Sequence, residues 1–322
     1  MKRAVWITWE NHRRTSELAR ALDAELIQFE SNRNQLIKYI QLSIKTLGAL
    51  INKRPDILIV QNPSIILAFL ASVLKTLFRY KLIVDRHTNF LLNKNKYNYT
   101  NRLFILLSDA SLKIADLTIV TNQFLKEHVE SKGGRSFVLP DKLPEMMYIP
   151  NEHDNINNIV TFICTYASDE PYGEVIQAAG ILDPHIKIFM TGNDKKIDPK
   201  LFNNMPNNLI VTGFLPEEEY EKLLKRSDII MDFTALDHCM VCGAYEAVSL
   251  GKPLITSDTT VLKNYFNKGT KHIQHTPAEM CDAIMTIYKD YHRYYSEMRQ
   301  LKAEIEMMWN EQFVKLRKLI YQ

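Results

Sequence analysis

Short runs of β-forming residues alternate with helical stretches along nearly the whole chain, and this alternation occurs twice. In the first half the β-rich runs lie at 4–8, 25–29, 57–61, 81–85, 117–121 and 137–139. Helical segments of this length between consecutive strands are typical of right-handed crossovers, which produce a parallel, doubly wound sheet. The predicted fold class is therefore α/β.

Between the two series the pattern is interrupted by proline punctuation at 140–144 and by the polar, Asn-rich segment 151–158. It restarts with β-rich runs at 159–165, 186–191, 209–211, 229–233 and 253–256. A chain of 322 residues also exceeds what one hydrophobic core usually holds. We expect two Rossmann-like domains facing a central cleft, at 1–150 and 151–300, with a final helix of about 301–322 packing back on the first domain.

The composition is that of an ordinary globular protein, with 46% hydrophobic and 24% charged residues, which excludes a disordered or fibrous chain. Four cysteines are too few to cross-link a protein of this size, so they are expected to be reduced thiols. The first apolar run ends at Ile7, and the longest, 65–74, is much shorter than the ~20 residues of a membrane span. These features favour a cytoplasmic protein.

Charge is distributed unevenly between the two halves. Residues 1–150 hold 22 Lys and Arg against 13 Asp and Glu, whereas the remainder holds 18 against 24. Within the basic half, an apolar stripe at 36, 40, 44, 47 and 51 lies beside Lys38, Lys45 and Lys53. We expect this stripe to pack on the sheet; peripheral contact with the inner face of a membrane carrying an acceptor lipid is the alternative. Basic and aromatic residues are not interleaved, which disfavours nucleic-acid binding.

The segment 237–255 is the most informative for chemistry, because small residues there lead from a strand into a helix that begins near Gly243. Free backbone N–H groups at such a helix start favour a phosphate. Glu246, in the first turn, can accept hydrogen bonds from a pair of ligand hydroxyls such as those of a ribose. The alternative is that Glu246 only complements the helix dipole.

The sequence Gly243-Ala-Tyr-Glu246-Ala-Val-Ser-Leu-Gly251-Lys-Pro253 resembles the sugar-nucleotide motif of GT-B glycosyltransferases, particularly those of family 4. The stretch 208–216 and Asp258 fit the same pattern. The resemblance implies a retaining, metal-independent hexosyltransferase that moves a sugar from a nucleotide-diphosphate donor of the UDP or GDP type. A hydroxyl on a glycan or a lipid-linked acceptor would receive it, in bacterial surface-polysaccharide or glycolipid assembly. No cofactor and no bound metal are expected.

The resemblance also assigns residues. It implies that Glu246 binds the ribose and that the backbone near Gly243 meets the diphosphate. The further donor-site candidates are Ala244, Tyr245, Gly192, Asn193 and Ser168. His87 stands where many members place a histidine close to the transferred sugar.

The chain departs from the family pattern in three places. His238 stands where the family has a second glutamate, the segment 165–173 lacks the basic residues that clamp the diphosphate, and 8–15 replaces a glycine-rich loop. We expect Arg13, Arg14 or Arg86 to neutralise the diphosphate instead, and His238 to donate a hydrogen bond to a phosphate or sugar oxygen. The alternative for Arg13 and Arg14 is that they are solvated surface charges, and the alternative for His238 is that it is a structural histidine. The candidates for binding the acceptor are Glu10, His12 and Arg86.

Two other functions remain open on the sequence. The missing Glu, Arg and Lys are also compatible with a catalytically degenerate protein that binds a nucleotide sugar or a partner. The second open function is a sugar-nucleotide epimerase or hydrolase of the same fold. Cys239 and Cys242 have C-x-x-C spacing, but the absence of a second pair disfavours zinc or redox chemistry.

Overall fold

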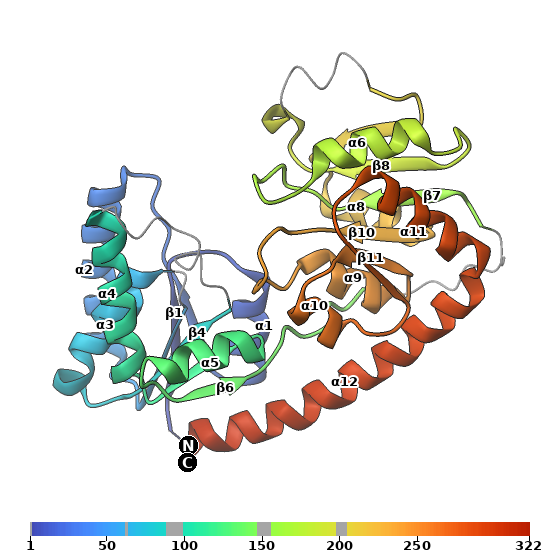
Figure 1. The fold of residues 1–322 in the computed structure, drawn as a ribbon. Coiled ribbons are helices and arrows are strands. Elements are labelled where there is room, and N and C mark those ends of the chain that lie inside the picture. The colour runs from blue at the N-terminus through green and yellow to red at the C-terminus, as the bar shows by residue number, and fades with distance from the viewer. Residues whose placement is uncertain (1, 62–63, 88–98, 147–155, 198–204) are drawn as a thin grey trace. The chain divides into compact units, whose positions relative to one another are not determined.

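The computed structural model of the chain is shown in Figure 1, and it describes residues 2–61, 64–87, 99–146, 156–197 and 205–322. The chain divides into two compact units. Unit 1 comprises Met1–Lys142 and Trp309–Gln322, and unit 2 comprises Leu143–Met308.

Unit 1 contains a six-stranded, wholly parallel sheet with the strand order β2-β1-β3-β4-β5-β6. The strands are β1 (Ala4–Thr8), β2 (Glu25–Gln28), β3 (Ile57–Gln61), β4 (Lys81–Arg86), β5 (Leu117–Val120) and β6 (Ser136–Val138). The helices are α1 (Arg13–Ala21), α2 (Gln35–Lys53), α3 (Ile65–Phe78), α4 (Tyr99–Ile114) and α5 (Gln123–Ser131).

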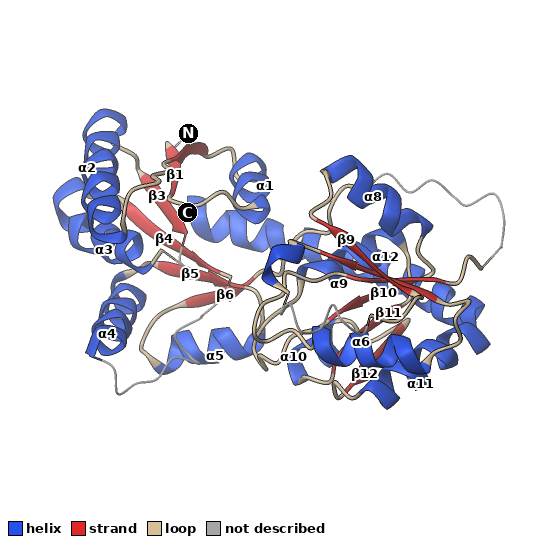
Figure 2. Ribbon diagram, turned by 90° about the horizontal axis from the view of Figure 1, so that it is seen from above, coloured by secondary structure: helices blue, strands red, loops and turns tan. Residues whose placement is uncertain are grey.

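Alternate residues of the central strands of unit 1 enter two separate cores, because both faces of the sheet are covered. Trp6 and Ile59 face α1, whereas Ile7 and Val60 face α2 and α3. Figure 2 shows α1 on one side of this sheet and α2 and α3 on the other.

Unit 2 repeats the architecture with the strand order β12-β11-β10-β7-β8-β9, again all parallel. Its strands are β7 (Ile159–Phe162), β8 (Lys187–Thr191), β9 (Leu209–Gly213), β10 (Ile229–Asp232), β11 (Leu254–Ser257) and β12 (Thr270–Ile273). Its helices are α6 (Tyr172–Ile181), the 3₁₀ turn η1 (Asp194–Lys196), α8 (Glu217–Arg226), α9 (Cys242–Leu250), α10 (Thr260–Tyr265), α11 (Pro277–Lys289) and α12 (Tyr291–Tyr321). The predicted α/β class with two Rossmann-like halves is confirmed.

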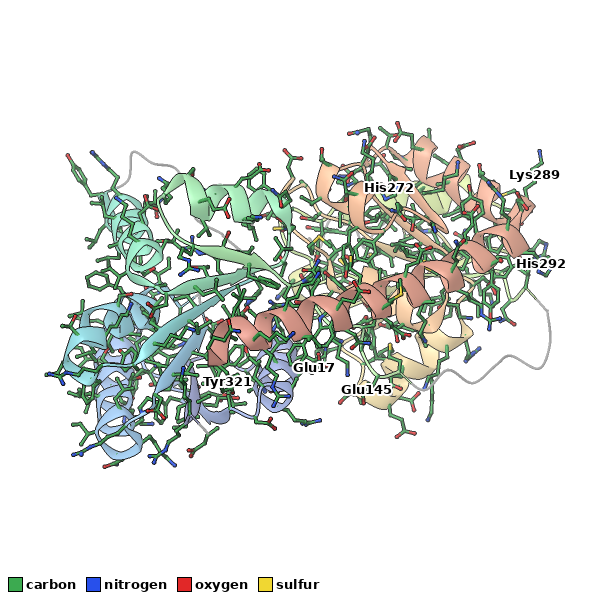
Figure 3. The ribbon with its side chains drawn as sticks, turned by 90° about the horizontal axis from the view of Figure 1, so that it is seen from below. Glu17, Glu145, His272, Lys289, His292 and Tyr321 are labelled. Atoms are coloured by element: carbon green, nitrogen blue, oxygen red, sulfur yellow. The ribbon has the colours of Figure 1, made fainter. Side chains whose placement is uncertain are left out.

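Helix α12 supplies side chains to both units. Met298 and Leu301 lie in a core of unit 2, whereas Trp309, Leu316 and Ile320 lie in a core of unit 1. Figure 3 shows its side chains from His292 near the start to Tyr321 at the end. Among the described residues, no helix combines the length and the apolar character needed to cross a membrane.

Candidate functional site

The start of helix α9 is capped by a carboxylate of the chain itself. Asp232, the buried last residue of β10, accepts a hydrogen bond from the amide of Gly243 at 2.6 Å. A Cβ on Gly243 would lie 2.5 Å from Ile163 Cδ1 and 2.6 Å from Asp232 Oδ2, so any larger residue would displace these two side chains. The amide that was predicted to meet a diphosphate is therefore already engaged.

The surroundings of Asp232 are unfavourable for negative charge. Burial raises the pKa of Asp232 well above its ordinary value, and the carboxylates of Glu246 and Glu170 act in the same direction. The hydrogen bond from Gly243 opposes this rise without cancelling it. A phosphate placed directly here would need a cation beside it.

Glu246 is half-buried on α9, and the hydroxyl of Tyr220 on α8 donates to its Oε2 at 2.5 Å. Burial and the negative charge of Glu246 raise the pKa of Tyr220, so the phenol stays protonated and remains a donor. One oxygen of the carboxylate is thus fixed in place by a second helix. Tyr220 was not singled out by the sequence, because no motif marks it.

Two of the predicted donor-site residues belong to the core instead. Ala244 is fully buried, and Tyr245 is 1% exposed. The Tyr245 ring packs against Tyr265 and Phe266 at centroid distances of 5.7 and 5.3 Å. Their position in the packed interior leaves a ligand no access to either side chain. His238 is likewise buried, in the loop between β10 and α9.

Gly192 follows β8 with φ +105°. A Cβ there would lie 2.2 Å from the carbonyl oxygen of Cys164, so the loop after β8 runs against the loop after β7 and requires glycine. Asn193 is exposed, and its side chain accepts from the amide of Lys195 at 3.2 Å, which caps η1.

The loop between β7 and α6 is organised around Glu170. Its carboxylate accepts hydrogen bonds from the amides of Thr165 and Ala167 at 2.8 and 3.0 Å and from the Thr165 hydroxyl at 2.9 Å. Ser168 is exposed on the same loop. An anionic residue therefore holds the segment in which the family carries its cations.

A cation nevertheless reaches this loop from a neighbouring element. Lys196, at the end of η1, is exposed, and its Nζ donates to the carbonyl oxygen of Thr165 at 3.4 Å. Lys196 is not marked by a sequence motif, because its relation to Thr165 depends on the adjacency of β7 and β8 rather than on spacing along the chain. The available signal was the pair Lys195-Lys196 shortly after Gly192.

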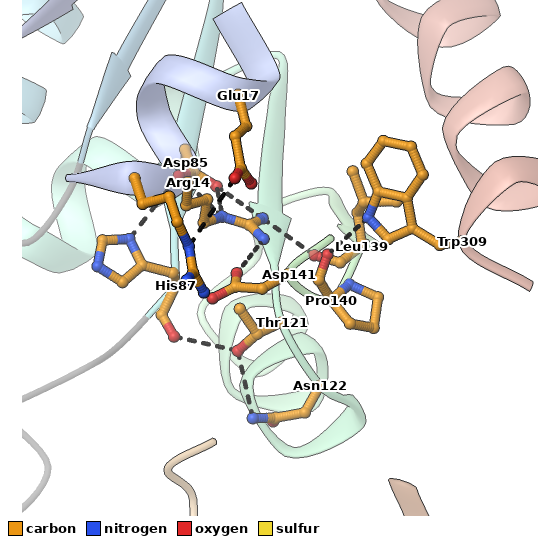
Figure 4. A network of polar contacts seen from close by, with 11 residues as sticks. Arg14, Glu17, Asp85, His87, Thr121, Asn122, Leu139, Pro140, Asp141 and Trp309 are labelled. Carbon is orange, nitrogen blue, oxygen red and sulfur yellow. Dashed lines mark hydrogen bonds and ion pairs between the residues drawn. The ribbon is translucent and has the colours of Figure 1, made fainter. Parts of the chain in front are cut away.

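In unit 1, Arg14 is buried and its guanidinium donates to two carboxylates and a backbone carbonyl (Figure 4). Nη2 donates to Asp85 at 3.0 Å and to the carbonyl of Leu139 at 2.9 Å, and Nη1 donates to Asp141 at 2.6 Å. Burial alone would raise the pKa of Asp85, but Arg14 lowers it to about 2. This geometry favours a structural role for Arg14 over the predicted contact with a diphosphate.

Arg13, in contrast, is exposed at the start of α1, with its Nε 3.8 Å from Glu17 Oε1. An exposed pair at this distance is weak. Arg13 therefore remains compatible with the predicted anion contact.

His12 and His87 are brought together at the carboxyl ends of β1 and β4, with ring centroids 4.5 Å apart. His87 Nδ1 lies 3.7 Å from Asp85 Oδ2. Burial lowers the pKa of His12, and the charge of His87 acts in the same direction. Glu10 is exposed on the loop that precedes His12.

Arg86 lies inside unit 1, with 1% of its surface exposed, and its Nη2 donates to the hydroxyl of Ser108 on α4. Burial lowers the pKa of Arg86 to about 10. The side chain thus points into the packed interior, which disfavours the predicted contact with an acceptor. Within the described part of the chain, no three His, Cys, Asp or Glu side chains are grouped so that they could hold a metal ion.

No family model and no curated protein sequence matches this chain. Solved structures do match. Anabaena HepE in complex with UDP and glucose is 13% identical, with a TM-score of 0.73 over 98% of this chain and 99% of that one. Sucrose-phosphate synthase from Thermosynechococcus elongatus is 12% identical, with a TM-score of 0.78 over 99% and 98%. A putative UDP-N-acetylglucosamine 2-epimerase from Listeria monocytogenes is 14% identical, with a TM-score of 0.63 over 92% and 91%.

These likenesses define the fold of the chain as the GT-B fold of nucleotide-sugar glycosyltransferases. The match to the epimerase shows that the fold alone does not decide the reaction. The residues of the site decide the reaction.

Proposed function

We propose that this chain is a glycosyltransferase that moves a sugar from a nucleotide-diphosphate donor to a hydroxyl acceptor. The observation that carries the proposal is the half-buried Glu246 carboxylate, held by the Tyr220 hydroxyl next to the carboxyl end of the unit 2 sheet. Ligands of open α/β sheets bind outside this edge. Because HepE, of the same fold, was crystallised with UDP and glucose, a UDP-sugar is the first donor to test.

The proposed donor site uses three features of unit 2. Glu246 accepts hydrogen bonds from the ribose hydroxyls, because a carboxylate has lone pairs on both oxygens. Gly192 lets the donor approach the backbone closely. Lys196 supplies the positive charge that the β7–α6 loop lacks, beside Ser168 and Asn193. His238 is proposed to donate to a phosphate or sugar oxygen from the loop before α9.

The proposed transfer retains the anomeric configuration and needs no metal and no enzymic nucleophile. The bond between the sugar C1 and the diphosphate oxygen breaks, and the acceptor oxygen bonds to C1 on the same face. The acceptor proton passes to the departing diphosphate oxygen. We assign acceptor and sugar contacts to His12, His87 and Glu10 of unit 1, with Arg13 as a further anion contact.

A lipid-linked or glycan acceptor in surface-polysaccharide or glycolipid assembly fits this transfer, with the protein on the cytoplasmic side. The motif 243–253 supports a hexosyltransferase of the family 4 type. Turnover of a UDP-hexose in the presence of a chelator would test the sugar class and the metal independence together.

The donor site is tested by calorimetric titration of wild type and Glu246→Ala with UDP, GDP, ADP and CMP. We expect one nucleotide to bind and the variant to bind it at least about tenfold more weakly, since hydrogen bonds to charged groups contribute about 1.5–3 kcal/mol. Glu218→Ala is the matched control, because Glu218 is exposed and pairs with Lys222. Failure of wild type to bind any of the four would overturn the donor-site assignment.

A second candidate function is a nucleotide-sugar-binding protein without turnover. It is favoured by the negative charges of Glu170 and Glu246, both of which raise the pKa of Asp232. These charges surround the place where transfer would require positive charge to neutralise the donor diphosphate. Nucleotide binding without sugar transfer would support it. Inversion at C2 or hydrolysis of the donor alone, followed by NMR, would instead indicate the epimerase or hydrolase alternative.

A further inference from the structure

Helix α2 has apolar side chains on two opposite faces. Leu42 and Leu50 are fully buried against the sheet, and between them Thr46 accepts a hydrogen bond from the Trp9 indole at 3.0 Å. The stripe predicted to pack on the sheet is the other face, and that prediction is wrong. Its members are exposed by 38 to 72%: Leu36, Ile40, Ile44, Leu47 and Ile51.

The neighbouring helices extend this exposed surface. Helix α3 adds Val73 and Leu77, and α4 adds Leu103 and Leu106. Figures 1 and 2 show α2, α3 and α4 next to one another on one flank of unit 1. Twelve of the twenty exposed large hydrophobic residues in the described part of the chain lie on these three helices. We call this set the α2–α4 surface: Leu36, Ile37, Ile40, Ile44, Leu47, Ile51, Val73, Leu77, Tyr99, Leu103, Leu106 and Ile114.

The charges on these helices are almost all positive. Helices α2 and α3 contain no Asp or Glu, and α4 contains one, Asp109, which pairs with Lys132 at 2.8 Å. The same helices carry six cations: Lys38, Lys45, Lys53, Lys75, Arg102 and Lys113. Two of them pair with carboxylates of neighbouring elements, Lys53 with Glu25 and Lys75 with Asp116. Arg54 and Arg79 follow at the C-caps of α2 and α3.

Exposed apolar side chains with a rim of Lys and Arg suit one kind of partner, a bilayer that contains anionic lipids. The apolar side chains enter the boundary of the acyl chains, and the cations meet the lipid phosphates. A second copy of this chain would bring a surface of the same positive sign against this one, which is unfavourable. We propose that the α2–α4 surface docks unit 1 on an anionic membrane as a peripheral protein.

The proposal does not depend on the transferase assignment, and its test needs no nucleotide. Wild type is incubated with vesicles of phosphatidylcholine alone and of phosphatidylcholine with about a third phosphatidylglycerol, and binding is measured by flotation. We expect binding to the anionic vesicles only, with loss at an ionic strength of about 1 M, where charges are screened within about 3 Å.

The variant Ile40→Ser/Ile44→Ser removes two side chains of the apolar stripe, and we expect vesicle binding to fall at least about tenfold. Lys38→Gln/Lys45→Gln tests the charge separately, with an expected loss of about fivefold for each cation. The matched control is Ile181→Ser/Met285→Ser, since both residues are exposed apolar side chains of unit 2. It should bind the vesicles as wild type does.

Because the substituted residues are exposed, the variants should keep the wild-type melting temperature, which separates loss of docking from loss of folding. Absence of wild-type binding to the anionic vesicles would overturn the proposal. Concentration-dependent self-association that is abolished by Ile40→Ser/Ile44→Ser would also overturn it and assign the surface to a second copy of the chain.

Discussion

The amide of Gly243 donates to the carboxylate of Asp232 over 2.6 Å, and this bond ties the start of α9 to the end of β10. In many α/β proteins a ligand phosphate occupies such a helix start. Here the Asp232 side chain occupies the place of the phosphate at the start of α9. Internal packing therefore explains Gly243 of the 243–253 motif. The remaining candidates for ligand contact are Glu246 and the loops after β7 and β8.

Gly243→Ala should destabilise unit 2 by about 1–3 kcal/mol, because the added Cβ would displace the side chains of Ile163 and Asp232 and weaken the hydrogen bond to Asp232. Urea unfolding measures the effect. Gly173→Ala makes the same change in α6, where a Cβ meets nothing within 4 Å. It should stabilise by about 0.5–1 kcal/mol. Equal effects of the two substitutions would contradict the packing argument.

Arg14→Ala should cost about 3–5 kcal/mol of stability, because it leaves Asp85 as a buried carboxylate without its partner. Arg13→Ala should change stability by less than about 0.5 kcal/mol, since Arg13 is exposed. The same two proteins are then titrated with UDP. If folded Arg14→Ala protein bound UDP more weakly while Arg13→Ala did not, the structural assignment of Arg14 would be wrong.

Tyr220→Phe removes the hydroxyl that fixes Glu246 and preserves the ring. We expect UDP affinity to fall about 2- to 12-fold, a free-energy cost of about 0.5–1.5 kcal/mol, because the hydroxyl acts on the nucleotide only by positioning the Glu246 carboxylate. Tyr288→Phe is the control, because its hydroxyl bonds to Asp228 rather than to Glu246. An unchanged affinity in Tyr220→Phe would show that Glu246 is positioned without this contact or does not bind the nucleotide.

The pH dependence of stability should contain a contribution from His12. Its pKa is lowered in the folded protein, mainly by burial, from an ordinary value of 6.5. Below about pH 6.5 the unfolded chain therefore binds a proton that the folded chain does not, and stability falls as the pH falls. His12→Gln should show a shallower loss between about pH 7 and 5 than wild type.

This pH prediction is checked by urea unfolding of wild type and His12→Gln at several pH values. His185→Gln, at an exposed position before β8, controls for the general effect of losing an imidazole. Identical slopes for wild type and His12→Gln would show that burial does not hold His12 neutral.

The fold was predictable because its determinants are local. Apolar runs such as 57–61 predict buried strands. The prolines at 140–144 lie at the junction of the two units, between Lys142 and Leu143. The strand β12 was missed, because Thr270-Lys-His-Ile has only one strongly apolar residue and is recruited by pairing with β11.

The site was harder to predict, because its contacts join residues from different elements. Whether an arginine is buried in an ion pair depends on which carboxylates the fold brings to it. Arg14 is buried against Asp85, whereas adjacent Arg13 is exposed beside Glu17. The apolar stripe of α2 was assigned to the wrong face for a related reason. Its period was clear, but Leu42 and Leu50 form a second apolar face that competes for the sheet.

The contribution of α12 to both units has a consequence for biosynthesis. Chains emerge from the ribosome with the N-terminal part first. All strands of unit 1 are therefore synthesised early, yet Trp309, Leu316 and Ile320, which complete one of its cores, follow only after the whole of unit 2. Until these residues are synthesised, one face of the unit 1 sheet stays partly uncovered. Unit 2 is translated second, yet it is the first that can finish folding.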